Sequence, residues 1–409
     1  MAFCGNAVVG QSGGPTAAIN ATLAGVIRGA KASDRVDRIF GMKNGVEGLI
    51  EDRLIDVTDT DEASLSLLED TPASALGSCR RKLPDVSSGD PVYGKIFEVF
   101  RRRNIRFFFY IGGNDSMDAV AKLSEYVKSQ SYEMCVVGIP KTIDNDLKFT
   151  DHTPGYGSAA KYIATTMQEI VRDCSVYTVK AMTVVEIMGR DSGWLTAAAG
   201  LTGYISGAAP AMIYLPEVPF SAERYFEDLG AAFGRAPFAV VAVSEGIRFA
   251  DGRYVGEGMQ SGSVDAFGHK YLSGAGRVVE AITKERFGCK TRSVELNLMQ
   301  RCASHLASAT DIEESAAIGQ AAVEAATESE NALTGVMAAF IRRGGKYGCD
   351  IVMHDIKDIA NEIKTVPREY INERGNGVTK ECCEYILPLI QGERKHIFEN
   401  GIPKHFSFR

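Results

Sequence analysis

Short, continuous apolar runs recur along the chain between longer segments that have the periodicity of helices. The runs are Ala7–Val9, Ile105–Ile111, Met134–Ile139, Thr183–Met188, Ala211–Leu215, Phe238–Val243 and Ile351–Met353. Apolar runs of this length are typical of strands in a parallel sheet whose two faces are both covered. Their alternation with helical segments predicts an α/β fold with helices on both faces of mainly parallel sheets.

Glycines and polar residues follow directly after several of these runs. The clusters are Gly10–Gly14, Gly112–Asp115, Pro140–Asp146, Gly189–Gly193 and Ser244–Gly246. Because ligands of open α/β sheets bind at the carboxyl ends of strands, we expect the clusters to share one crevice. Elsewhere, the glycine-rich segment 251–276 is expected to be a loop or insertion, and 311–329 a solvated amphipathic helix.

The first two clusters have the composition of phosphate-binding turns. After the first, a helix is expected to begin near Pro15, because proline is favoured at the first helical position. Exposed amides at the start of a helix suit a phosphate group, and glycines let the backbone approach it closely. Neither the Walker ending nor the dinucleotide Gly-x-Gly-x-x-Gly spacing is present. A purely structural turn, or an Asp/Ser helix cap, therefore stays open for these two clusters.

The third cluster carries the most specific chemistry. It places Lys141, Thr142, Asp144 and Asp146 within six residues after a buried strand. A lysine can neutralise a bridging phosphate while a carboxylate accepts the proton of an attacking alcohol, and phosphoryl transfer needs both. A turn accounts for the proline, asparagine and aspartates, but it does not account for the lysine.

Composition narrows the class of protein. The hydrophobic fraction of 45% is typical of a packed globular protein, and the length of 409 residues predicts two or three domains. The net charge of −7 gives no general attraction to nucleic acid or anionic membranes. Nine cysteines without metal-type spacing predict reduced thiols in a cytoplasmic protein. We expect neither a secretory leader nor a membrane span, because no basic-then-apolar leader and no long apolar stretch occurs in the sequence.

Taken together and in order, the clusters resemble the motifs of the phosphofructokinase family over roughly residues 5 to 305. The matching motifs are Gly13-Gly14, Gly112-Gly113-Asn114-Asp115, Pro140–Asp146, Met188-Gly189-Arg190 and Glu245-Gly246. Four later segments look like the pyrophosphate-using branch of that family and extend the match to nearly the whole chain. They are Asn297–His305, Val366–Tyr370, Gly375–Thr379 and Leu387–Gln391.

The resemblance implies a fold and an activity. The fold is two Rossmann-like three-layer α/β domains with the active site in the cleft between them. Residues 1–155 plus about 300–355 would bind the phosphoryl donor, and about 156–299 plus 356–409 the sugar phosphate. The activity is reversible, Mg²⁺-dependent transfer of a phosphoryl group from pyrophosphate to the C1 hydroxyl of fructose 6-phosphate, a step of glycolysis or gluconeogenesis. The resemblance also implies a homodimer or homotetramer with sites near subunit interfaces.

The same resemblance assigns roles to individual residues. Asp144 is implied to be the general base for the C1 hydroxyl, with Thr142 and Asp146 positioning that hydroxyl and the metal. Lys141 and Asp115 complete the implied catalytic group. Substrate contacts are implied for Gly13, Gly14, Arg80, Thr142, Met188, Gly189, Arg190, Glu245, Arg292 and Arg301, of which Arg292 would reach the sugar phosphate of a neighbouring subunit.

Two positions indicate which phosphoryl donor is used. ATP-using members of the family resemble Gly-Gly-Asp-Gly-Ser and Pro-Gly-Thr-Ile-Asp-Asn-Asp, whereas this chain has Asp115 and Lys141 at the two variable glycines. A carboxylate about 4 Å from the α-phosphate of ATP would repel it by ~1 to 4 kcal/mol. The ammonium of Lys141 favours a compact, highly charged anion. Both positions favour pyrophosphate over a nucleotide.

Three positions depart from the family's pattern. Asn114 stands where the family has its magnesium-linked aspartate, so Asn114 and Asp146 are expected to hold Mg²⁺ weakly, with pyrophosphate and water supplying the other ligands. Leu298 replaces a histidine of many ATP-using relatives, and Ala181 replaces an arginine from the adjoining subunit. The cations available to compensate for the last two losses are Lys180, Arg292 and Arg301.

Several alternatives remain at this point. The chain could be an ATP-dependent phosphofructokinase or a sedoheptulose 7-phosphate kinase of the same fold. A non-catalytic regulatory subunit is disfavoured because Asp144 and Lys141 are both present, and a dinucleotide-binding oxidoreductase because the fingerprint spacing is absent. Simple structural roles are expected for His269 as a loop residue, for Arg81 and Lys82 as a solvated face, and for Trp194 as a core residue. The vicinal pair Cys382 and Cys383 is expected to serve helix packing.

Overall fold

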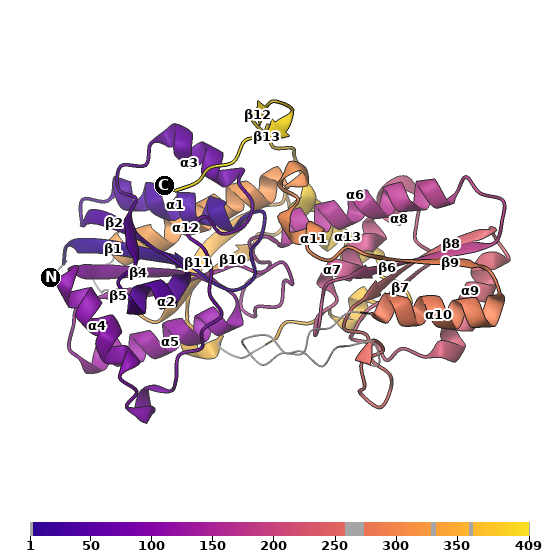
Figure 1. Ribbon diagram of the computed structural model, residues 1–409, viewed down its shortest axis with the longest axis horizontal. Coiled ribbons are helices and arrows are strands. Elements are labelled where there is room, and N and C mark those ends of the chain that lie inside the picture. Colours follow the sequence, from indigo (N-terminus) through magenta and orange to yellow (C-terminus); the bar gives the residue numbers. More distant parts are fainter. Residues whose placement is uncertain (1–2, 258–273, 329–332, 360–362, 409) are drawn as a thin grey trace.

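The computed structural model describes residues 3–257, 274–328, 333–359 and 363–408, and within them two large β-sheets lie side by side, each between layers of helices (Figure 1). The first sheet has the strand order β11-β10-β5-β4-β1-β2-β3, and the second β7-β8-β6-β9. Strands of the first sheet are β1 (Gly5–Gln11), β2 (Val36–Met42), β3 (Leu54–Asp56), β4 (Ile105–Gly112), β5 (Cys135–Pro140), β10 (Val336–Arg342) and β11 (Cys349–Asp355). Those of the second are β6 (Ala181–Ile187), β7 (Met212–Tyr214), β8 (Phe238–Ser244) and β9 (Lys290–Glu295).

Each of the seven apolar runs found in the sequence overlaps a strand, and four of them lie wholly within one. The second sheet is parallel throughout, and the first is parallel except where β3 pairs with β2 and β11 with β10. The prediction of mainly parallel sheets is confirmed. The exception is the run Ile351–Met353, which lies in the antiparallel edge strand β11. A short two-stranded ribbon of β12 (Phe398–Glu399) and β13 (Ile402–Pro403) follows near the carboxyl end.

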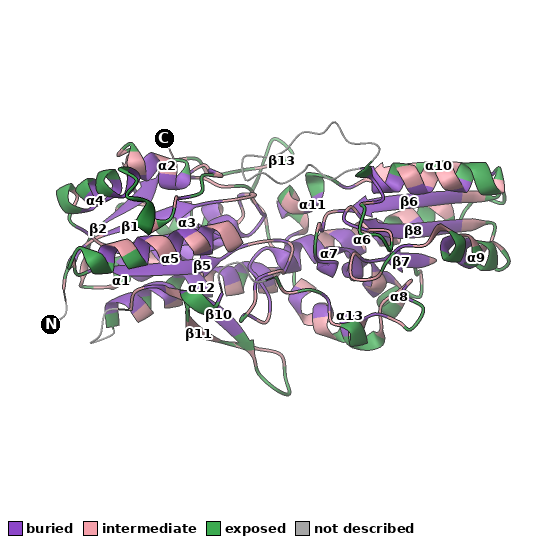
Figure 2. Ribbon diagram, turned by 90° about the horizontal axis from the view of Figure 1, so that it is seen from below, coloured by how far each residue is buried: buried purple, intermediate pink, exposed green. Residues whose placement is uncertain are grey.

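Each large sheet is the middle layer of three. In the first sheet, successive residues of a strand, such as Phe108 and Phe109, belong to different apolar cores on the two faces. One core is covered by α1 (Ile19–Ala32) and α12 (Ala309–Glu328), and the other by α4 (Val92–Arg102) and α5 (Asn114–Ser129). Figure 2 shows the strands buried beneath helices whose outward sides are exposed. The predicted three-layer α/β fold is thus confirmed.

The second sheet has the same construction. On one face, α6 (Tyr156–Cys174), α7 (Trp194–Ala197) and α13 (Lys380–Ile386) contribute to a core around Val185 and Ala242. On the other, α9 (Ala222–Phe233) and α10 (Ala275–Phe287) cover Val184 and Val241. The shorter helices are α2 (Gly45–Ile50), α3 (Glu62–Glu69), α8 (Leu201–Ser206) and α11 (Met299–Cys302).

Helices α1 and α12 approach each other very closely. A Cβ atom on Gly25 would lie 2.0 Å from the carbonyl oxygen of Ala316, so only glycine fits there. The amphipathic helix expected over 311–329 is present as α12, which packs one face on α1 and leaves Glu313, Gln320 and Glu324 exposed. Asp311, at the start of α12, is also buried, and its carboxylate accepts hydrogen bonds from the amides of Gly155 and Ser158 at the start of α6.

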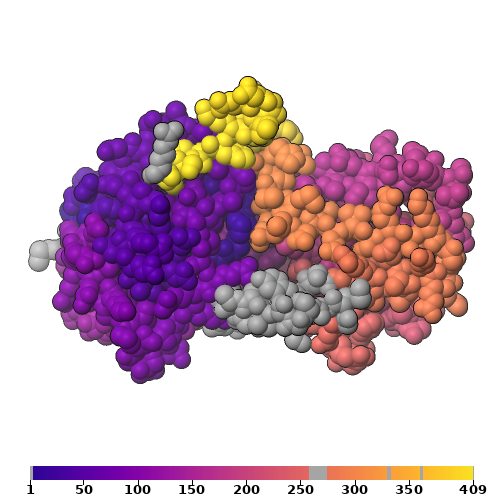
Figure 3. All heavy atoms as spheres, in the orientation of Figure 1, coloured from indigo at the N-terminus to yellow at the C-terminus, as the bar shows by residue number. Residues whose placement is uncertain are grey.

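The end of the chain returns to the first sheet. Figure 3 shows the C-terminal segment, in yellow, crossing from the middle of the molecule over the half that contains the N-terminal strands. Arg394 pairs with Glu69 and Asp70, and the amide of Phe406 donates to Thr71 Oγ1. These contacts fix the C-terminal segment against α3 and its following turn.

Candidate active site

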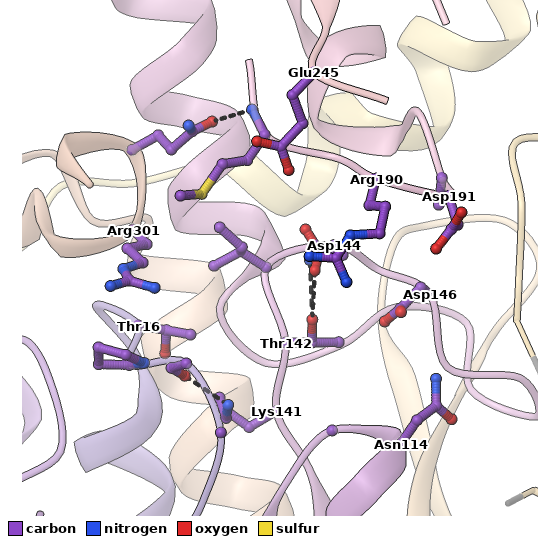
Figure 4. A pocket seen from close by; sticks show the side chains of 18 of the residues that line it. Thr16, Asn114, Lys141, Thr142, Asp144, Asp146, Arg190, Asp191, Glu245 and Arg301 are labelled. Carbon is purple, nitrogen blue, oxygen red and sulfur yellow. Dashed lines mark hydrogen bonds between the residues drawn. The ribbon is translucent and has the colours of Figure 1, made fainter. Parts of the chain in front are cut away.

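The carboxyl ends of strands from both sheets open into one pocket of about 740 Å³. Residues from all five polar clusters line it: Gly13 and Gly14 after β1, Asn114 and Asp115 after β4, Lys141, Thr142, Asp144 and Asp146 after β5, Arg190 after β6, and Glu245 after β8. Figure 4 shows ten of the lining side chains labelled. The expectation that the clusters share one crevice is therefore confirmed by their placement.

Lys141 lies at the end of the pocket that belongs to the first sheet. It is buried, and its Nζ donates a hydrogen bond of 2.6 Å to the carbonyl oxygen of Gly14. Gly13 has φ of +76°, and a Cβ there would lie 3.2 Å from the lysine nitrogen. Burial lowers the pKa of Lys141 to about 8, although Asp144 and Asp146 oppose the shift. This end of the pocket combines a buried cation with open backbone, as an anion site requires.

The first helix begins later than the sequence analysis predicts. Helix α1 starts at Ile19 rather than near Pro15. Thr16 Oγ1 accepts hydrogen bonds from the amides of Ala18 and Ile19, and this side chain takes the place of the expected proline start. The segment between Gly13 and Thr16 therefore stays irregular, and it lines the pocket.

Asp115 forms an ion pair that the sequence analysis did not anticipate. Its Oδ1 lies 3.0 Å from Nζ of Lys82, and both residues line the pocket. Lys82 is exposed, as expected, but it also borders the pocket, because the chain after Gly77 brings it across to the start of α5. Arg80 lines the pocket as well, whereas Arg81 is exposed. No pattern in the sequence distinguishes Lys82 from Arg81.

Asp144 and Thr142 lie on the loop after β5 at the middle of the pocket. The amide of Asp144 donates to Thr142 Oγ1 over 3.1 Å, and the Thr142 hydroxyl lies 3.5 Å from Asp144 Oδ2. Burial raises the pKa of Asp144 against the opposing charges of Lys141 and Arg190. A carboxylate that is disfavoured by burial is a better proton acceptor, so this geometry suits a general base.

Asn114 and Asp146 supply oxygen atoms on one side of the pocket, as Figure 4 shows. Asn114 Oδ1 is buried and has no hydrogen-bond partner among the described residues. Burial, and secondarily Asp144, raises the pKa of Asp146 to about 7. An unpartnered amide oxygen and carboxylates that line the same pocket are donors of the kind that a hard divalent cation takes, so the residues present fit Mg²⁺.

The other end of the pocket is formed by the second sheet and by α11. Glu245 Oε1 accepts from the amide of Gly189 over 3.3 Å, and the amide of Met188 donates to Gln300 Oε1 over 3.2 Å. Burial raises the pKa of Glu245 to about 8. Arg301, on α11, faces the pocket from this side, but its guanidinium reaches the turn after β1, since a Cβ on Gly14 would lie 3.5 Å from Arg301 Nη1. Burial together with Arg80 lowers the pKa of Arg301. Cations and a carboxyl group here could hold a phosphate and hydroxyls of one ligand.

Arg292 and Lys180 lie elsewhere. Arg292 is an exposed residue of the edge strand β9, away from the lining of the pocket. Lys180 has its Nζ 5.1 Å from the centre of the Phe233 ring. Among the three cations expected to compensate for Leu298 and Ala181, it is Arg301 that lines the pocket within this chain, as does Leu298 itself.

Further lining residues were not singled out by sequence reasoning. They are Glu186, Asp191, Ser192, Glu295, Asn297, Gln300 and Ile363. Asp191 and Ser192 belong to the cluster at 189–193, and Asn297 and Gln300 to the motif at 297–305, so those motifs already signalled them. Ile363 carries no such signal, because tertiary pairing with Leu147 brings it to the site.

The remaining sequence candidates have simple outcomes. Trp194 is a core residue, 3% exposed, and Cys382 and Cys383 are buried in the packing of α13, as expected. All nine cysteines are free.

His269 lies outside the described residues. Within the part of the chain that the structure describes, none of the helices has the length and apolar character needed to cross a membrane.

The whole chain is similar to known proteins in both sequence and structure. A family model described as phosphofructokinase matches residues 6–326. The pyrophosphate–fructose 6-phosphate 1-phosphotransferases of Halomonas elongata and Methylococcus capsulatus are each 39% identical, over 98% of this chain and 95% of theirs. The crystal structure of a pyrophosphate-dependent phosphofructokinase from Nitrosospira multiformis superposes with a TM-score of 0.88 at 36% identity, covering 98% of this chain and 96% of that one.

Proposed function

Because this chain belongs to the phosphofructokinase family, we propose that it catalyses the reversible transfer of a phosphoryl group from inorganic pyrophosphate to the C1 hydroxyl of fructose 6-phosphate. The products are fructose 1,6-bisphosphate and phosphate. Relatives that are 38% to 39% identical over 98% to 99% of this chain carry the name of that activity. The ATP-dependent kinases and the non-catalytic subunit considered from sequence are the competing functions.

The observation that carries the donor assignment is the arrangement of Lys141 and Asp115 at one end of the pocket. Lys141 is held against the backbone of Gly14, where its ammonium can contact a bridging or transferred phosphoryl group. Asp115 and its partner Lys82 occupy the neighbouring wall. The ion pair reduces the repulsion expected from a lone carboxylate, but it fills space that a glycine would leave to a nucleotide. A small tetra-anion suits this end better than ATP.

The reaction itself is assigned to the loop after β5. Asp144 accepts the proton of the C1 hydroxyl as that oxygen attacks the phosphoryl group, while Thr142 keeps the carboxylate oriented. Lys141 stabilises the negative charge that develops on the transferred group and on the departing phosphate. In the reverse direction the same carboxylic acid returns its proton to the C1 oxygen.

The acceptor is assigned to the side of the pocket formed by the second sheet and α11. Arg301 and Arg190 line the pocket and would bind the 6-phosphate and neighbouring oxygens, while Glu245 would accept hydrogen bonds from sugar hydroxyls. Met188 and Gly189 hold the strand end beside it through the bonds to Gln300 and Glu245. This arrangement orients the C1 hydroxyl toward Asp144.

Mg²⁺ is the proposed cofactor, and Asn114 and Asp146 are the residues that would hold it. When bound, the ion would neutralise pyrophosphate oxygens and so favour attack on the phosphorus. The amide of Asn114 has no charge, so we assign much of the binding to the carboxylate of Asp146 and to pyrophosphate itself.

The proposal extends to the organisation of the enzyme. We assign donor binding to residues 1–155 plus about 300–355, and sugar phosphate binding to about 156–299 plus 356–409. We further assign the enzyme to the cytoplasm, in keeping with its free cysteines, and to a homodimer or homotetramer in which Arg292 reaches a neighbouring subunit's site.

A screen of donors and acceptors with purified protein and Mg²⁺ tests this function. Pyrophosphate and ATP are each offered with fructose 6-phosphate and with sedoheptulose 7-phosphate, and the bisphosphate product is measured. The proposal predicts turnover with pyrophosphate and fructose 6-phosphate, and formation of pyrophosphate from fructose 1,6-bisphosphate and phosphate. Preference for ATP would contradict the donor assignment, and absence of turnover with every pair would favour a regulatory subunit.

A further inference from the structure

Asn145 separates the two acidic residues of the site and points away from them. Asp144 and Asp146 line the pocket, whereas Asn145 is fully buried on the opposite side of the loop. Its φ is +52°, a left-handed conformation that asparagine tolerates better than most residues. This backbone conformation lets the side chains on both sides of Asn145 face the same pocket.

Both ends of the Asn145 amide are held by residues from the C-terminal part of the chain. Its Oδ1 accepts a hydrogen bond of 3.0 Å from Nζ of Lys364, and its Nδ2 donates one of 3.1 Å to the hydroxyl of Tyr385. More than two hundred residues of sequence separate each partner from Asn145. The orientation of the acidic loop therefore depends on a distant segment.

Lys364 uses its remaining donors on the same loop. Its Nζ also donates to the carbonyl oxygens of Thr150, over 3.2 Å, and Asp151, over 2.7 Å. All three ammonium protons thus have partners. Its backbone amide donates to the carbonyl oxygen of Asp146 over 2.8 Å. The Tyr385 hydroxyl donates to the carbonyl oxygen of Asp151 as well, over 2.5 Å.

The carbonyl oxygen of Lys364 is bound to the loop that carries the sugar end of the pocket. It accepts hydrogen bonds from Trp194 Nε1, over 3.2 Å, and from Ser192 Oγ, over 3.1 Å. Ser192 lines the pocket, and Trp194 starts α7. One residue therefore joins the loop after β5, in the donor part, to the loop after β6, in the acceptor part.

We propose that Lys364 and Tyr385 are positioning residues that act through Asn145 to set the place of Asp144 and Asp146 relative to the two substrates. The inference rests on the proposed role of Asp144 as general base. Without the Lys364 amine, Asn145 Oδ1 and two carbonyl oxygens lose their hydrogen-bond donor, and the left-handed turn loses its main support. The acidic side chains then shift, while the groups that bind the substrates keep their places.

The test compares Lys364→Met and Tyr385→Phe with two matched controls on the surface, Lys346→Met and Tyr204→Phe. For each, kcat and the KM values for pyrophosphate and fructose 6-phosphate are measured with saturating Mg²⁺, and folding is checked by thermal melting. We expect kcat to fall about 10- to 100-fold in Lys364→Met, because an ångström of misplacement costs about that much. We expect a smaller fall in Tyr385→Phe, with KM values within about threefold and controls unchanged.

The double variant adds a readout that a general loss of stability would not give. Because both side chains act on the same amide, Lys364→Met with Tyr385→Phe should lower kcat by less than the product of the single effects. If Lys364→Met does not fold, Tyr385→Phe decides, since it removes one oxygen and keeps the ring. Folded variants with kcat within twofold of the wild type, or with raised KM and unchanged kcat, would overturn the inference.

Asp144→Asn, assayed in parallel, separates this inference from the function on which it depends. Loss of turnover in Asp144→Asn with full turnover in Lys364→Met and Tyr385→Phe would overturn the positioning role alone. Full turnover in Asp144→Asn would remove the proposed base and, with it, the reason for positioning Asp144.

Discussion

At the scale of single residues, the chemistry depends on how burial changes the charged groups of one loop. Lys141 and Asp144 are three residues apart, and burial acts on both: it lowers the pKa of the lysine to about 8 and raises the pKa of the aspartate. A bound phosphoryl anion would stabilise the ammonium form of Lys141. The buried negative charge of Asp144 is instead neutralised when the carboxylate takes up the proton of the C1 hydroxyl. The pair therefore has separate roles, one electrostatic and one in proton transfer.

Replacing Asp144 by asparagine tests the second role. The amide keeps the size and the bond from its own backbone to Thr142, but it cannot accept the proton of the C1 hydroxyl. We expect kcat to fall about 10²- to 10⁴-fold, with fructose 6-phosphate binding retained when measured by calorimetry. Asp118→Asn, on α5 outside the pocket, is the matched control and should leave kcat unchanged. Unchanged turnover in Asp144→Asn would exclude it as the base.

At the scale of the elements, the contact between α1 and α12 shows why some glycines are indispensable. Helix α1 follows the loop after β1, which lines the pocket, and Asp311 of α12 holds the start of α6. Gly25 has no room for a side chain against the backbone of Ala316, and backbone cannot move aside as a flexible side chain can.

Gly25→Ala is therefore expected to lower the free energy of unfolding by about 1 to 3 kcal/mol, as measured by urea denaturation. Gly230→Ala provides the control: it lies in the exposed interior of α9, and nothing lies within 4 Å of the added methyl group. That substitution should stabilise by about 0.5 to 1 kcal/mol. Equal effects at the two positions would contradict the packing argument.

The elements also show what sequence can predict. Continuous apolar runs identified β1, β4, β5, β6, β7, β8 and β11, and the clusters after five of them identified most of the site. The edge strand β9 was missed because Lys290–Glu295 is mostly polar, and β10 because its alanines resemble a helix. Pocket residues with no neighbouring motif, such as Lys82 and Ile363, were missed because tertiary contacts alone bring them there.

At the scale of the whole molecule, a buried cluster of charges connects the first sheet to α12 and the C-terminal part of the chain. His152 is 2% exposed, and its two ring nitrogens lie 2.9 Å from carboxylate oxygens of Asp151 and Glu314. Arg342, on β10, pairs with Asp151 as well. Burial alone would lower the pKa of His152, but the two carboxylates outweigh it and raise the pKa above its usual value.

This cluster predicts a pH dependence of stability. Since the pKa of His152 is higher in the folded than in the unfolded state, its stabilising contribution is fully present below about pH 6.5 and is lost as pH rises through the folded-state pKa. The destabilisation caused by His152→Gln should therefore be larger at pH 5.5 than at pH 9, measured as the change in Tm. The exposed His305→Gln is the control. A destabilisation that grows with pH would contradict the assignment.

The assembly can be tested by combining two variants that are each expected to have reduced activity. If Arg292 acts in the site of a neighbouring subunit, Asp144→Asn and Arg292→Ala should each lower activity, while co-expression should restore part of it. In a mixed dimer, the site on the Asp144→Asn subunit contains both substitutions. The site on the Arg292→Ala subunit contains neither, because it has its own Asp144 and the Arg292 of the other subunit. Absence of recovery in a verified mixed oligomer would contradict a shared site, and so would full activity of Arg292→Ala.

The claim that pyrophosphate is the donor is tested most directly by the paired substitution of Asp115 and Lys141 with glycine. The measurement is kcat/KM for pyrophosphate and for ATP, each with fructose 6-phosphate and Mg²⁺, in the wild type and in the double variant. We predict that the wild type uses pyrophosphate and that the double variant loses most of this activity and gains turnover with ATP. A wild type that prefers ATP, or a double variant that still uses pyrophosphate at the wild-type rate, would contradict the account.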